Sequence, residues 1–489
     1  MKQATITIRD EVNIRIEGLD LDTRKALVKA FKYEDPTARF RPAYRLGRWD
    51  GKVGFFQLGG STYVNLLPEI VPILERHDYD IDLDDQRDYA TQFEFSSVQE
   101  DSFAHIAWGA GHPLAGQPIQ LRDYQVRIVN DFLSNPQCLQ EVATGAGKTI
   151  MTAALSQRCE AHGRTIVIVP NKSLVTQTEK DYRALGLDVG VYFGDRKELG
   201  LTHTICTWQS LNVLMKNTQS GTAEYTIHDF LQDVVAVIVD EVHMAKADAL
   251  KTLLTGVMSR VPIRWGLTGT VPKEKFESVP LTVSIGPVIS HLSASELQDR
   301  GVLAQCHVNI VQLVDLVEYK DYQSELKYLL EESGRLDTVA ALIQRVNATG
   351  NTLVLVDRVA AGHALVERLG DRAVFVSGAT KAKARQDEYD QVAESSDKII
   401  VATYGVAAVG INIPRIFNLV LVEPGKSFVR VIQSIGRGIR KAEDKDHVEI
   451  WDITSTCKFA KRHLTKRKQF YKEANYPFTQ EKLDWMKIK

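Results

Sequence analysis

Residues 142–150, Val-Ala-Thr-Gly-Ala-Gly-Lys-Thr-Ile, constrain this chain more than any other stretch. In a tight turn through Gly145 and Gly147, successive backbone N–H groups can point at phosphate oxygens, and the helix that follows adds its positive dipole end. Lys148 would then reach the β and γ phosphates of a nucleotide, and the Thr149 hydroxyl would bind Mg²⁺. The strict pattern has a glycine at its first position, which this chain lacks, so a tight strand-to-helix turn is the alternative interpretation.

Composition places the chain among ordinary globular proteins. Its 489 residues allow about three domains at ~150 residues each. No apolar run reaches the ~18 residues that a membrane span needs, and residues 1–8 alternate like a strand rather than reading as a signal peptide. The five cysteines are scattered and include no CxxC pair, so we expect no disulfide framework and no zinc site. We therefore expect a cytoplasmic protein.

The formal net charge of −2 argues against a nucleic-acid partner, but the distribution of charge argues for one. Residues 24–52 carry nine Lys or Arg against three acids, and residues 458–472 carry seven. Each basic stretch predicts either phosphate contacts or a solvated face of the fold. Aromatic residues interleave with the second stretch, which suits either a surface that grips a nucleic-acid strand or a helix that docks its rings on the preceding domain.

Residues 1–88 are predicted to form a small α+β domain. Apolar side chains alternate over residues 6–16, which predicts two strands, and two helices and a last strand over residues 79–83 follow. Periodicity is then lost and Gly and Pro accumulate, so residues 89–118 are predicted to form a linker.

From residue 119 the chain alternates helices with short apolar strands, the pattern of a doubly wound α/β fold. The strands are rich in Val and Ile without alternation, as buried parallel strands are. One series predicts strands over 138–142, 165–169, 204–207, 234–239 and 264–267, and a second over 308–313, 352–356, 373–376, 399–402, 418–422 and 448–453.

Only the first series contains a phosphate loop, which suggests a duplicated motor that binds one nucleotide between its halves. The predicted fold class is therefore α/β, with two tandem doubly wound parallel-sheet lobes, residues 119–290 and 291–455. The small amino-terminal domain precedes them, and a basic and aromatic extension, residues 456–489, follows.

An acidic pair, Asp240-Glu241, follows the apolar run 234–239. The carboxyl end of such a strand is where an acidic Mg²⁺ partner of the phosphate loop must lie. Asp240 would hold the metal, directly or through water, and Glu241 would orient and deprotonate the attacking water. Alone, such a pair is more often a helix cap. Together with the loop upstream, it predicts nucleotide hydrolysis.

The second series ends in Gln433-Ser-Ile-Gly-Arg437-Gly-Ile-Arg440, which places two arginines three residues apart on one expected helical face. Negative charge develops on the γ phosphate during phosphoryl transfer, and an arginine inserted from a second lobe stabilises it. Closing of the lobes would then complete the site and couple hydrolysis to motion. A solvated basic helix is the alternative.

These motifs, in this order and spacing, resemble those of superfamily 2 helicases over roughly residues 119–455. The phosphate loop resembles motif I, in which the first glycine is often absent, and Asp240-Glu-Val-His243 resembles motif II. The other stretches that carry the resemblance are Leu121–Gln125 (the adenine-sensing glutamine motif), Val169–Leu174 (motif Ia), Thr207–Ser210 (a DNA-contacting motif), Leu267–Thr270 (motif III), Ala402–Asn412 (motif V) and Gln433–Arg440 (motif VI).

The resemblance implies that the two parallel-sheet lobes are RecA-like. It also implies ATP-driven translocation on nucleic acid, with roles for individual residues. ATP would be bound by Arg122, Gln125, Thr144, Gly145, Ala146, Gly147, Lys148, Thr149 and Gly410, and catalysis would use Lys148, Asp240, Glu241, Gln433, Arg437 and Arg440. Nucleic acid would be contacted by Lys172, Thr207, Gln209 and Thr403. His243 and Thr268 would couple the nucleotide site to motion, although His243 alone could equally be a core histidine.

The segment Phe40–Gly51 resembles part of the small domain that precedes the motor in phage branch-migration helicases of the UvsW type. Arg45 and Arg48 would contact DNA phosphates, and Trp49 would stack on the duplex. A tryptophan buried in a turn predicts the same sequence.

The resemblance therefore implies an ATP-dependent DNA helicase that unwinds or branch-migrates Holliday junctions, forks and D-loops in phage recombination, repair and replication. Its cofactors would be ATP and Mg²⁺, and its partners would be branched or forked DNA together with recombination or replication proteins. We expect a monomer in the cytoplasm, or in that of the host cell if a phage encodes it. The alternative is an ATP-driven duplex translocase of a restriction or RNA-remodelling system. An ATP-gated clamp is disfavoured because the whole catalytic set is present.

Overall fold

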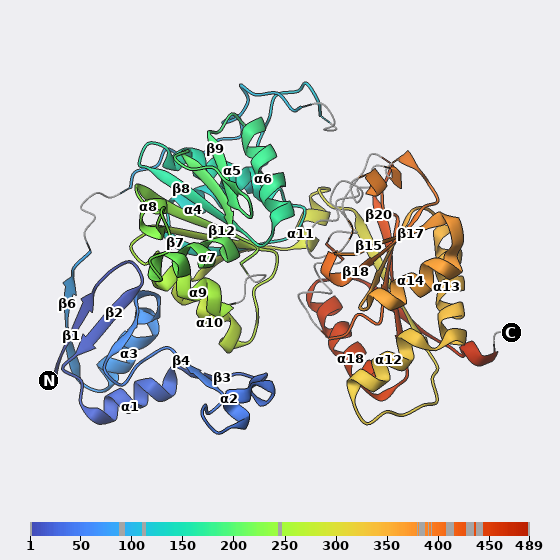
Figure 1. The fold of residues 1–489 in the computed structure, drawn as a ribbon, viewed down its shortest axis with the longest axis horizontal. Helices are drawn as coiled ribbons and strands as arrows, with labels where there is room; N and C mark the ends of the chain where they lie inside the picture. Colours follow the sequence, from blue (N-terminus) through green and yellow to red (C-terminus); the bar gives the residue numbers. More distant parts are fainter. Residues whose placement is uncertain are drawn as a thin grey trace. The chain divides into compact units, whose positions relative to one another are not determined.

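The computed structural model describes residues 2–487 apart from 88–92, 110–113, 243–246, 379, 381–386, 390, 393, 407–414, 427–434 and 437–443. The chain forms two units, residues 1–141 with 147–291 and residues 142–146 with 292–489 (Figure 1). Each unit is built around one large sheet, and the first unit also carries the amino-terminal domain. The predicted α/β class with two tandem parallel-sheet lobes is confirmed.

The amino-terminal domain is a four-stranded sheet with two helices packed on it. Its main elements are β1 (Lys2–Ile8), β2 (Asn13–Glu17), α1 (Leu21–Ala30), β5 (Ser61–Tyr63), η2 (Val64–Leu66), α3 (Leu67–Arg76) and β6 (Tyr79–Asp85), with strand order β5-β2-β1-β6. Alternate side chains of β1 and β2, such as Ile6 and Ile14, are buried in a common core with Leu27 and Leu74 from the helices. The last strand, β6, pairs in parallel with β1.

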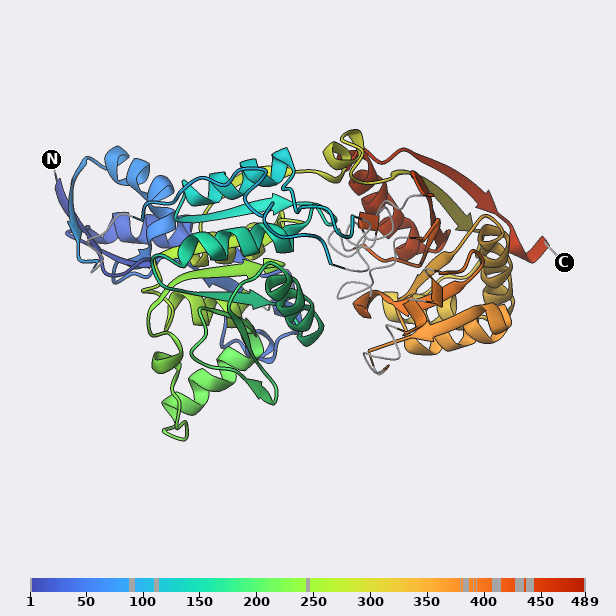
Figure 2. The same cartoon turned by 90° about the horizontal axis from the view of Figure 1, so that it is seen from above.

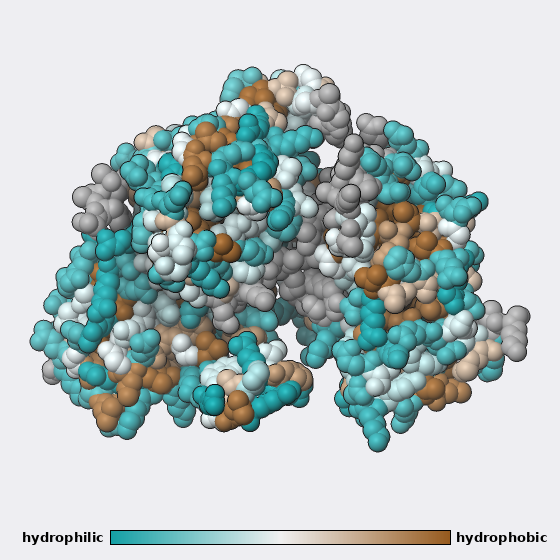
Figure 3. All heavy atoms as spheres, in the orientation of Figure 1, coloured by the Kyte–Doolittle hydropathy of each residue, from teal (hydrophilic) through white to brown (hydrophobic). Residues whose placement is uncertain are grey.

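An excursion over residues 35–51 leaves this domain from a separate two-stranded sheet. Its elements are β3 (Lys32–Glu34), η1 (Ala38–Phe40), α2 (Pro42–Arg45) and β4 (Lys52–Gly54). At its base, the buried Asp35 accepts a hydrogen bond from Thr37 N (2.7 Å) and pairs with Arg41 (3.0 Å). Figure 3 shows apolar side chains among hydrophilic ones over this excursion, at the bottom of the view.

The amino-terminal domain packs directly on the first lobe. Glu11 N donates to Ser259 O (3.0 Å), and Gln137 Nε2 donates to Glu11 O (2.8 Å). Val279 and Val283, on α10 (Lys275–Ser284) of the first lobe, belong to the apolar core of the amino-terminal domain. The two domains therefore share a helix and form one continuous structure.

The first lobe contains an eight-stranded sheet. Its strands in spatial order are β10 (Arg196–Lys197), β9 (Val189–Phe193), β11 (His203–Thr207), β8 (Arg164–Val169), β12 (Val234–Asp240), β13 (Ile263–Thr268), β7 (Gln137–Val142) and β14 (Val288–Leu292). The strands from β9 to β7 run parallel and include all five predicted strands of the first series. The sequence did not predict β9, β10 and β14.

Helices cover both faces of this sheet (Figure 2). One face carries α4 (Asp123–Leu133), α5 (Lys148–Cys159) and α6 (Lys172–Ala184), and the other carries α7 (Trp208–Gln219), α8 (Ile227–Phe230), α9 (Ala247–Thr255) and α10. Ile166 and Ile168 point into the core under the second group, because side chains of a strand alternate between its faces. None of the described helices combines the length and apolar character that crossing a bilayer requires.

Residues 93–109, within the predicted linker, lie along the first lobe. The ring of Phe95 is 5.9 Å from that of Trp265, and Phe103 is fully buried. The backbone N–H and C=O of Val98 both bond to the Asn130 side chain, at 2.8 and 2.9 Å. This segment therefore contributes to the packing of the lobe.

The second lobe contains a seven-stranded sheet in which every pairing is parallel. Its strands in spatial order are β17 (Ala373–Val376), β18 (Ile399–Thr403), β16 (Thr352–Val356), β19 (Asn418–Val422), β20 (His447–Ser455), β15 (Gln305–Leu313) and β21 (Phe478–Leu483). All six predicted strands of the second series are present. The remaining described helices are α11 (Ala294–Asp299), α12 (Tyr322–Glu331), α13 (Ser333–Asn347), α14 (Val359–Leu369), η4 (Gly370–Arg372), α18 (Lys458–Glu473) and η5 (Trp485–Lys487).

The last residues of the chain are built into this lobe. β21 pairs with β15 at the edge of the sheet, where Figure 2 shows it in red beside the olive β15. Helix α18 contacts Asp452 of β20, whose side chain faces away from the core that α13 and α14 cover. Of the two interpretations of the basic and aromatic extension, the structure therefore favours docking, because Tyr471 and Tyr476 are buried.

Candidate functional site

The phosphate-loop residues lie at the turn between β7 and α5. Gly145 and Gly147 have left-handed backbone angles, with φ of 93° and 84°, which residues with a side chain rarely adopt. A Cβ on Gly147 would lie 2.6 Å from Gln125 Nε2, so glycine is needed here for close approach as well as for the turn. Thr144 and Thr149 are half-buried, and Ala146 is buried.

Gln125 is positioned by the start of α4. Its Oε1 accepts a hydrogen bond from Arg122 N (2.9 Å), which is half of a capping box. The Arg122 guanidinium in turn donates to Tyr124 Oη (2.8 Å). Because Oε1 is held in this way, the amide nitrogen of Gln125 faces Gly147. The two stretches predicted to contact ATP are thus in mutual contact.

Two carboxylates at the end of β12 share a lysine. Lys148 Nζ lies 2.8 Å from Glu241 Oε1, and both side chains are nearly buried. Glu241 has a φ of 51°, and its backbone N–H donates to Asp240 Oδ1 (2.9 Å). Burial, and then the Glu241 carboxylate, raise the pKa of Asp240 to about 6, against the opposing effect of Lys148. Such a site favours the arrival of a further cation.

The turn after β13 contacts the same acidic pair. Gly269 N donates to Glu241 Oε2 at 3.4 Å, a long hydrogen bond. The buried Thr268 hydroxyl donates to Thr270 O (2.9 Å), which fixes the turn that presents Gly269. Thr268 therefore lies one residue from a group that touches Glu241.

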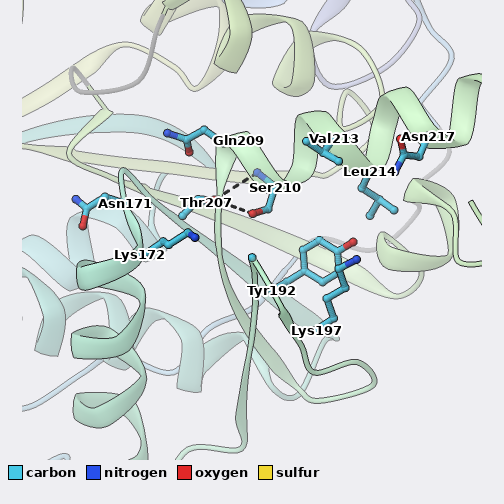
Figure 4. Close-up of a pocket in the computed structure, with 11 residues that line it drawn as sticks. Asn171, Lys172, Tyr192, Lys197, Thr207, Gln209, Ser210, Val213, Leu214 and Asn217 are labelled. Atoms are coloured by element: carbon cyan, nitrogen blue, oxygen red, sulfur yellow. Dashed lines mark hydrogen bonds between the residues drawn. The ribbon is translucent and has the colours of Figure 1, made fainter. Parts of the chain in front are cut away.

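A second site lies at the amino-terminal ends of α6 and α7. It is a pocket of about 440 Å³ (Figure 4), lined by Asn171, Lys172, Tyr192, Gly194, Lys197, Thr207, Gln209, Ser210, Val213, Leu214 and Asn217. Asn171 caps α6 by accepting from Leu174 N (3.1 Å), and Thr207 caps α7 by accepting from Ser210 N (3.3 Å). Three predicted DNA contacts, Lys172, Thr207 and Gln209, thus meet in one pocket with two helix amino termini.

Sequence reasoning missed Tyr192, Lys197 and Asn217 at this pocket. Tyr192 and Lys197 belong to the hairpin β9–β10, which the sequence did not predict. Asn217 lies on α7, ten residues beyond Thr207 and therefore close to three helical turns away. The available signal was that helical spacing, which places Gln209, Val213 and Asn217 along one side of α7.

The predicted amino-terminal DNA contacts lie on the excursion 35–51. Arg48 is exposed, and Arg45 is exposed while its Nε donates to Arg39 O (3.1 Å). Trp49 is half-buried, its Nε1 donates to Lys52 O (2.8 Å), and the Arg41 guanidinium lies 5.3 Å from its ring centroid. These contacts give Trp49 a structural role in the turn.

The remaining predicted residues belong to the second half of the motor. Thr403 is half-buried at the carboxyl end of β18. His243, Gly410, Gln433, Arg437 and Arg440 lie outside the residues that the structure describes.

Two family models match this chain where the two lobes lie. Residues 118–273 match the type III restriction enzyme res subunit, and residues 334–442 match the helicase conserved C-terminal domain. The chain is 23% identical over 492 residues to the ATP-dependent DNA helicase uvsW of Enterobacteria phage T4, covering 96% of this chain and 94% of that protein.

The chain is a superfamily 2 helicase. It is an ATP-dependent DNA helicase, and it is 24% identical over 370 residues to the DNA 3'-5' helicase XPB of Kineococcus radiotolerans, covering 73% of this chain and 64% of that protein. Among solved structures, the type ISP restriction-modification enzyme LlaBIII bound to DNA shares the fold. Its TM-score is 0.55 at 16% identity, over 86% of this chain and 36% of that one.

The helicase has a second cluster of buried charge, which sequence reasoning did not find, at the carboxyl ends of the strands of its second lobe. Arg335 of α13 donates to Asp315 Oδ2 (3.2 Å), to Glu423 Oε1 (2.5 Å) and to Leu329 O (2.7 Å). Asp315 also accepts from Tyr328 Oη (3.2 Å). Burial is the main cause that raises the pKa of Glu423 to about 7, against the opposing effect of Arg335.

A neighbouring ion pair continues this cluster. Arg467 of α18 binds Asp452 through two hydrogen bonds of 2.8 and 2.9 Å, and its Nη1 donates to Gly425 O (2.8 Å). Tyr471 Oη also donates to Asp452 (2.7 Å). In the second lobe, arginine side chains therefore hold buried carboxylates at or near the carboxyl ends of the strands.

Proposed function

We propose that the helicase hydrolyses ATP at the site formed by Gly147, Lys148, Thr149, Asp240 and Glu241. Lys148 is already within 3 Å of Glu241, so arriving phosphates would draw it from the carboxylate and leave Glu241 to take a proton from water. The carboxylate of Asp240 and the hydroxyl of Thr149 are hard oxygen donors suited to Mg²⁺. Mg²⁺, when bound, supplies charge neutralisation at the phosphates.

The motif resemblance also assigns residues of the second lobe to hydrolysis. Gln433, Arg437 and Arg440 would stabilise the charge that develops on the γ phosphate, and Gly410 would approach the nucleotide. Gln125 would select adenine. Thr268 and His243 would couple changes at Glu241 in the nucleotide site to motion of the motor. The motif resemblance carries these assignments.

DNA would follow the pocket at α6 and α7. Lys172 supplies a positive charge there, and two helix amino termini point their N–H groups toward the same region, which suits phosphate oxygens. Thr207 and Gln209 offer hydrogen bonds from the same pocket. Thr403 would extend these contacts on the second lobe.

The preferred substrate of the proposed function is branched DNA: Holliday junctions, forks and D-loops. The observation that carries this proposal is the exposed excursion 35–51. It presents Arg45 and Arg48 beside the exposed apolar residues Phe40 and Leu46, on a domain that shares its core with the first lobe. The alignment with uvsW supports it, because it extends over 96% of this chain and so includes that domain.

The direct test compares ATP hydrolysis and unwinding on single-stranded, duplex, forked and four-way DNA and on RNA. We expect the largest stimulation and the fastest unwinding on forked and four-way DNA. Lys148→Ala should lower DNA-stimulated hydrolysis by roughly a hundredfold or more, since a charge at the transferred phosphate is lost. Hydrolysis on linear DNA without unwinding of any junction would instead support the alternative, a duplex translocase of a restriction or RNA-remodelling system.

The role of the excursion has its own test. Arg48→Ala should weaken binding to a four-way junction and reduce the slope of log affinity against log salt by about 0.9, the value for one phosphate contact on duplex DNA. Lys25→Ala, on the exposed face of α1, is the matched control. An unchanged slope for Arg48→Ala would remove the excursion from the phosphate contacts.

We further propose that the helicase acts as a monomer in the cytoplasm, or in that of the host cell if a phage encodes it. The functional division of the chain would remain 1–88, 89–118, 119–290, 291–455 and 456–489. Analytical ultracentrifugation with and without junction DNA tests the monomer.

A further inference from the structure

Helix α18 turns one face to the second lobe and the opposite face to solvent. Ala460, Leu464, Arg467 and Tyr471 are buried, at intervals of three or four residues. Between them, the solvent-facing side presents a basic stripe: Lys458, Lys461, Arg462, Lys466 and Lys472, all exposed. Glu473, the last residue, is the only acid in the helix.

Buried polar contacts fix this helix at several points. The backbone N–H groups of Phe459 and Ala460 donate to the carboxylate of Glu325 on α12, at 3.0 and 2.7 Å. One turn from the other end, Arg467 and Tyr471 both bond to Asp452. Arg467 therefore docks the helix and is not part of the basic stripe. Because the helix is fixed, it loses little conformational entropy when the basic stripe binds a partner.

The aromatic rings near α18 are withdrawn from solvent. Tyr471 is fully buried and Tyr476 is nearly so. Phe459 is half-buried, with Lys458 and Arg462 over its ring at 5.8 and 5.9 Å. Surfaces that grip single strands need exposed rings on which bases can stack. The exposed face of α18 offers cations instead, which favours a backbone of paired DNA over an unpaired strand.

The dimensions of the basic stripe fit a duplex. From Lys458 to Lys472 the helix rises ~21 Å, at 1.5 Å per residue. A duplex advances 3.4 Å per base pair, so this length corresponds to about six base pairs of one strand. Among the described residues, no carboxylate forms an ion pair with these five side chains. Their charge is therefore available to phosphates.

We propose that the basic stripe of α18 binds the phosphate backbone of duplex DNA. This proposal rests on the proposed function, because it names a second surface for the DNA on which the motor acts. The contact is independent of base sequence, since lysine and arginine read phosphate charge and not base edges at such a surface. The basic stripe would give the second lobe a duplex-binding surface that lies outside the helicase motifs.

The experiment measures equilibrium binding of the full-length protein to a fluorescent blunt duplex without nucleotide, at several salt concentrations. Lys461→Glu/Lys466→Glu should lower the slope of log affinity against log salt by about 2, at 0.9 per phosphate contact. Arg345→Glu/Arg372→Glu changes the charge equally at two exposed positions of the same lobe and should leave the slope within about 0.5 of the wild type. An equal slope in both double variants would overturn the proposal.

Two further measurements separate the possible failures. The Lys461→Glu/Lys466→Glu substitutions should reduce the affinity for a single-stranded oligonucleotide of equal length by less than they reduce the affinity for the duplex. An equal or greater reduction for the single strand would assign the stripe to unpaired DNA and contradict the proposal. Lys461→Gln/Lys466→Gln, which only removes charge, should show the same direction if the Glu variant unfolds. DNA-independent ATP hydrolysis should stay unchanged in all variants, whereas failure of the proposed ATP site would show in Lys148→Ala and leave the binding slopes unaffected.

Discussion

Both lobes bury carboxylates at the carboxyl ends of their parallel strands, but they neutralise them differently. In the first lobe, Lys148 forms an ion pair with Glu241, and its charge also acts on Asp240. In the second, Arg335 and Arg467 reach the carboxylates with planar guanidinium groups that also bond to backbone carbonyls. On the proposal above, phosphates would draw Lys148 away from Glu241 and leave this edge open. The edge of the second lobe is locked by the hydrogen bonds of its arginines.

The difference shows how one architecture serves two purposes. A parallel sheet brings loops from distant parts of the chain together at its carboxyl edge, whether or not a ligand binds there. In the first lobe, Gly145 and Gly147 lie at this edge and leave room for the phosphates of the proposed site. The second lobe fills it with arginine, tyrosine and tryptophan side chains, including Trp485, whose Nε1 donates to Asp315 (3.0 Å). Buried charge alone therefore does not mark a catalytic site.

The largest expected effect comes from the same chemical change made in both lobes. Glu241→Gln should lower the DNA-stimulated kcat for ATP by about 100- to 10,000-fold, because the proposed general base is lost. Glu423→Gln should leave kcat within about twofold, since within the described part of the chain this carboxylate accepts its hydrogen bonds from Arg335 and Thr454. Steady-state kinetics measure kcat for both variants. Comparable losses of kcat in Glu241→Gln and Glu423→Gln would contradict the distinction between the open edge of the first lobe and the locked edge of the second.

Breaking the locked edge should cost stability. Arg335→Met leaves Asp315 and Glu423 buried without their guanidinium, which should lower the free energy of unfolding by about 3–5 kcal/mol. Arg345→Met makes the same substitution at an exposed position of the same helix and should cost under about 0.5 kcal/mol. Urea denaturation, with hydrogen exchange of β15 and β20 to localise the effect, measures both. If the two variants differ by less than about 1 kcal/mol in the free energy of unfolding, the ion pairs of Arg335 contribute little beyond the cost of their desolvation.

Stability of the second lobe should depend on pH through Glu423. Its pKa is raised from 4.5 to about 7, so the folded state binds a proton more tightly than the unfolded state. The resulting stabilisation is fully present below pH 4.5 and is lost as the pH rises through about 7. The stability of the wild type relative to Glu423→Gln should therefore increase from pH 8 to pH 5 in urea titrations. A constant difference over this range would mean that the carboxylate stays charged throughout.

The smallest expected effect concerns one hydroxyl. Tyr471→Phe removes a hydrogen bond to Asp452, which keeps both of its bonds from Arg467. We expect a loss of about 1 kcal/mol in the free energy of unfolding and no change in ATP hydrolysis. Thermal denaturation beside the ATPase assay checks this, with Tyr44→Phe, on the exposed excursion, as the control. A loss above 3 kcal/mol would mean that α18 depends on this single contact for docking.

Most strands of both lobes could be predicted because a strand that is buried on both faces is a continuous apolar run in the sequence. Runs such as Val234–Val239 and Thr352–Val356 are apolar at every position or nearly so, and they match β12 and β16. β21 was missed for the opposite reason: an edge strand needs few apolar residues, and Phe-Thr-Gln-Glu-Lys-Leu reads as loop. In β9, Gly190 interrupts the apolar run.

The candidate sites also differ in how much of their signal is local in the sequence. Lys148, Asp240 and Glu241 could be found because each follows a strand within a short motif, and the structure brings Lys148 and Glu241 into contact. The cluster around Arg335 could not, because its members lie far apart in the chain and meet only through tertiary packing. Each of them, taken alone, looks like an ordinary surface charge. The roles assigned to the motif residues remain predictions.

The sharing of α10 between two domains limits how this protein can be cut or recombined. Val279 and Val283 complete the core of the amino-terminal domain, yet they belong to the chain that ends the first lobe. A shortened protein that starts at residue 119 would expose both valines and the surface around Ser259. We expect such a fragment to aggregate, so the amino-terminal domain is an inseparable part of the motor and not an exchangeable module.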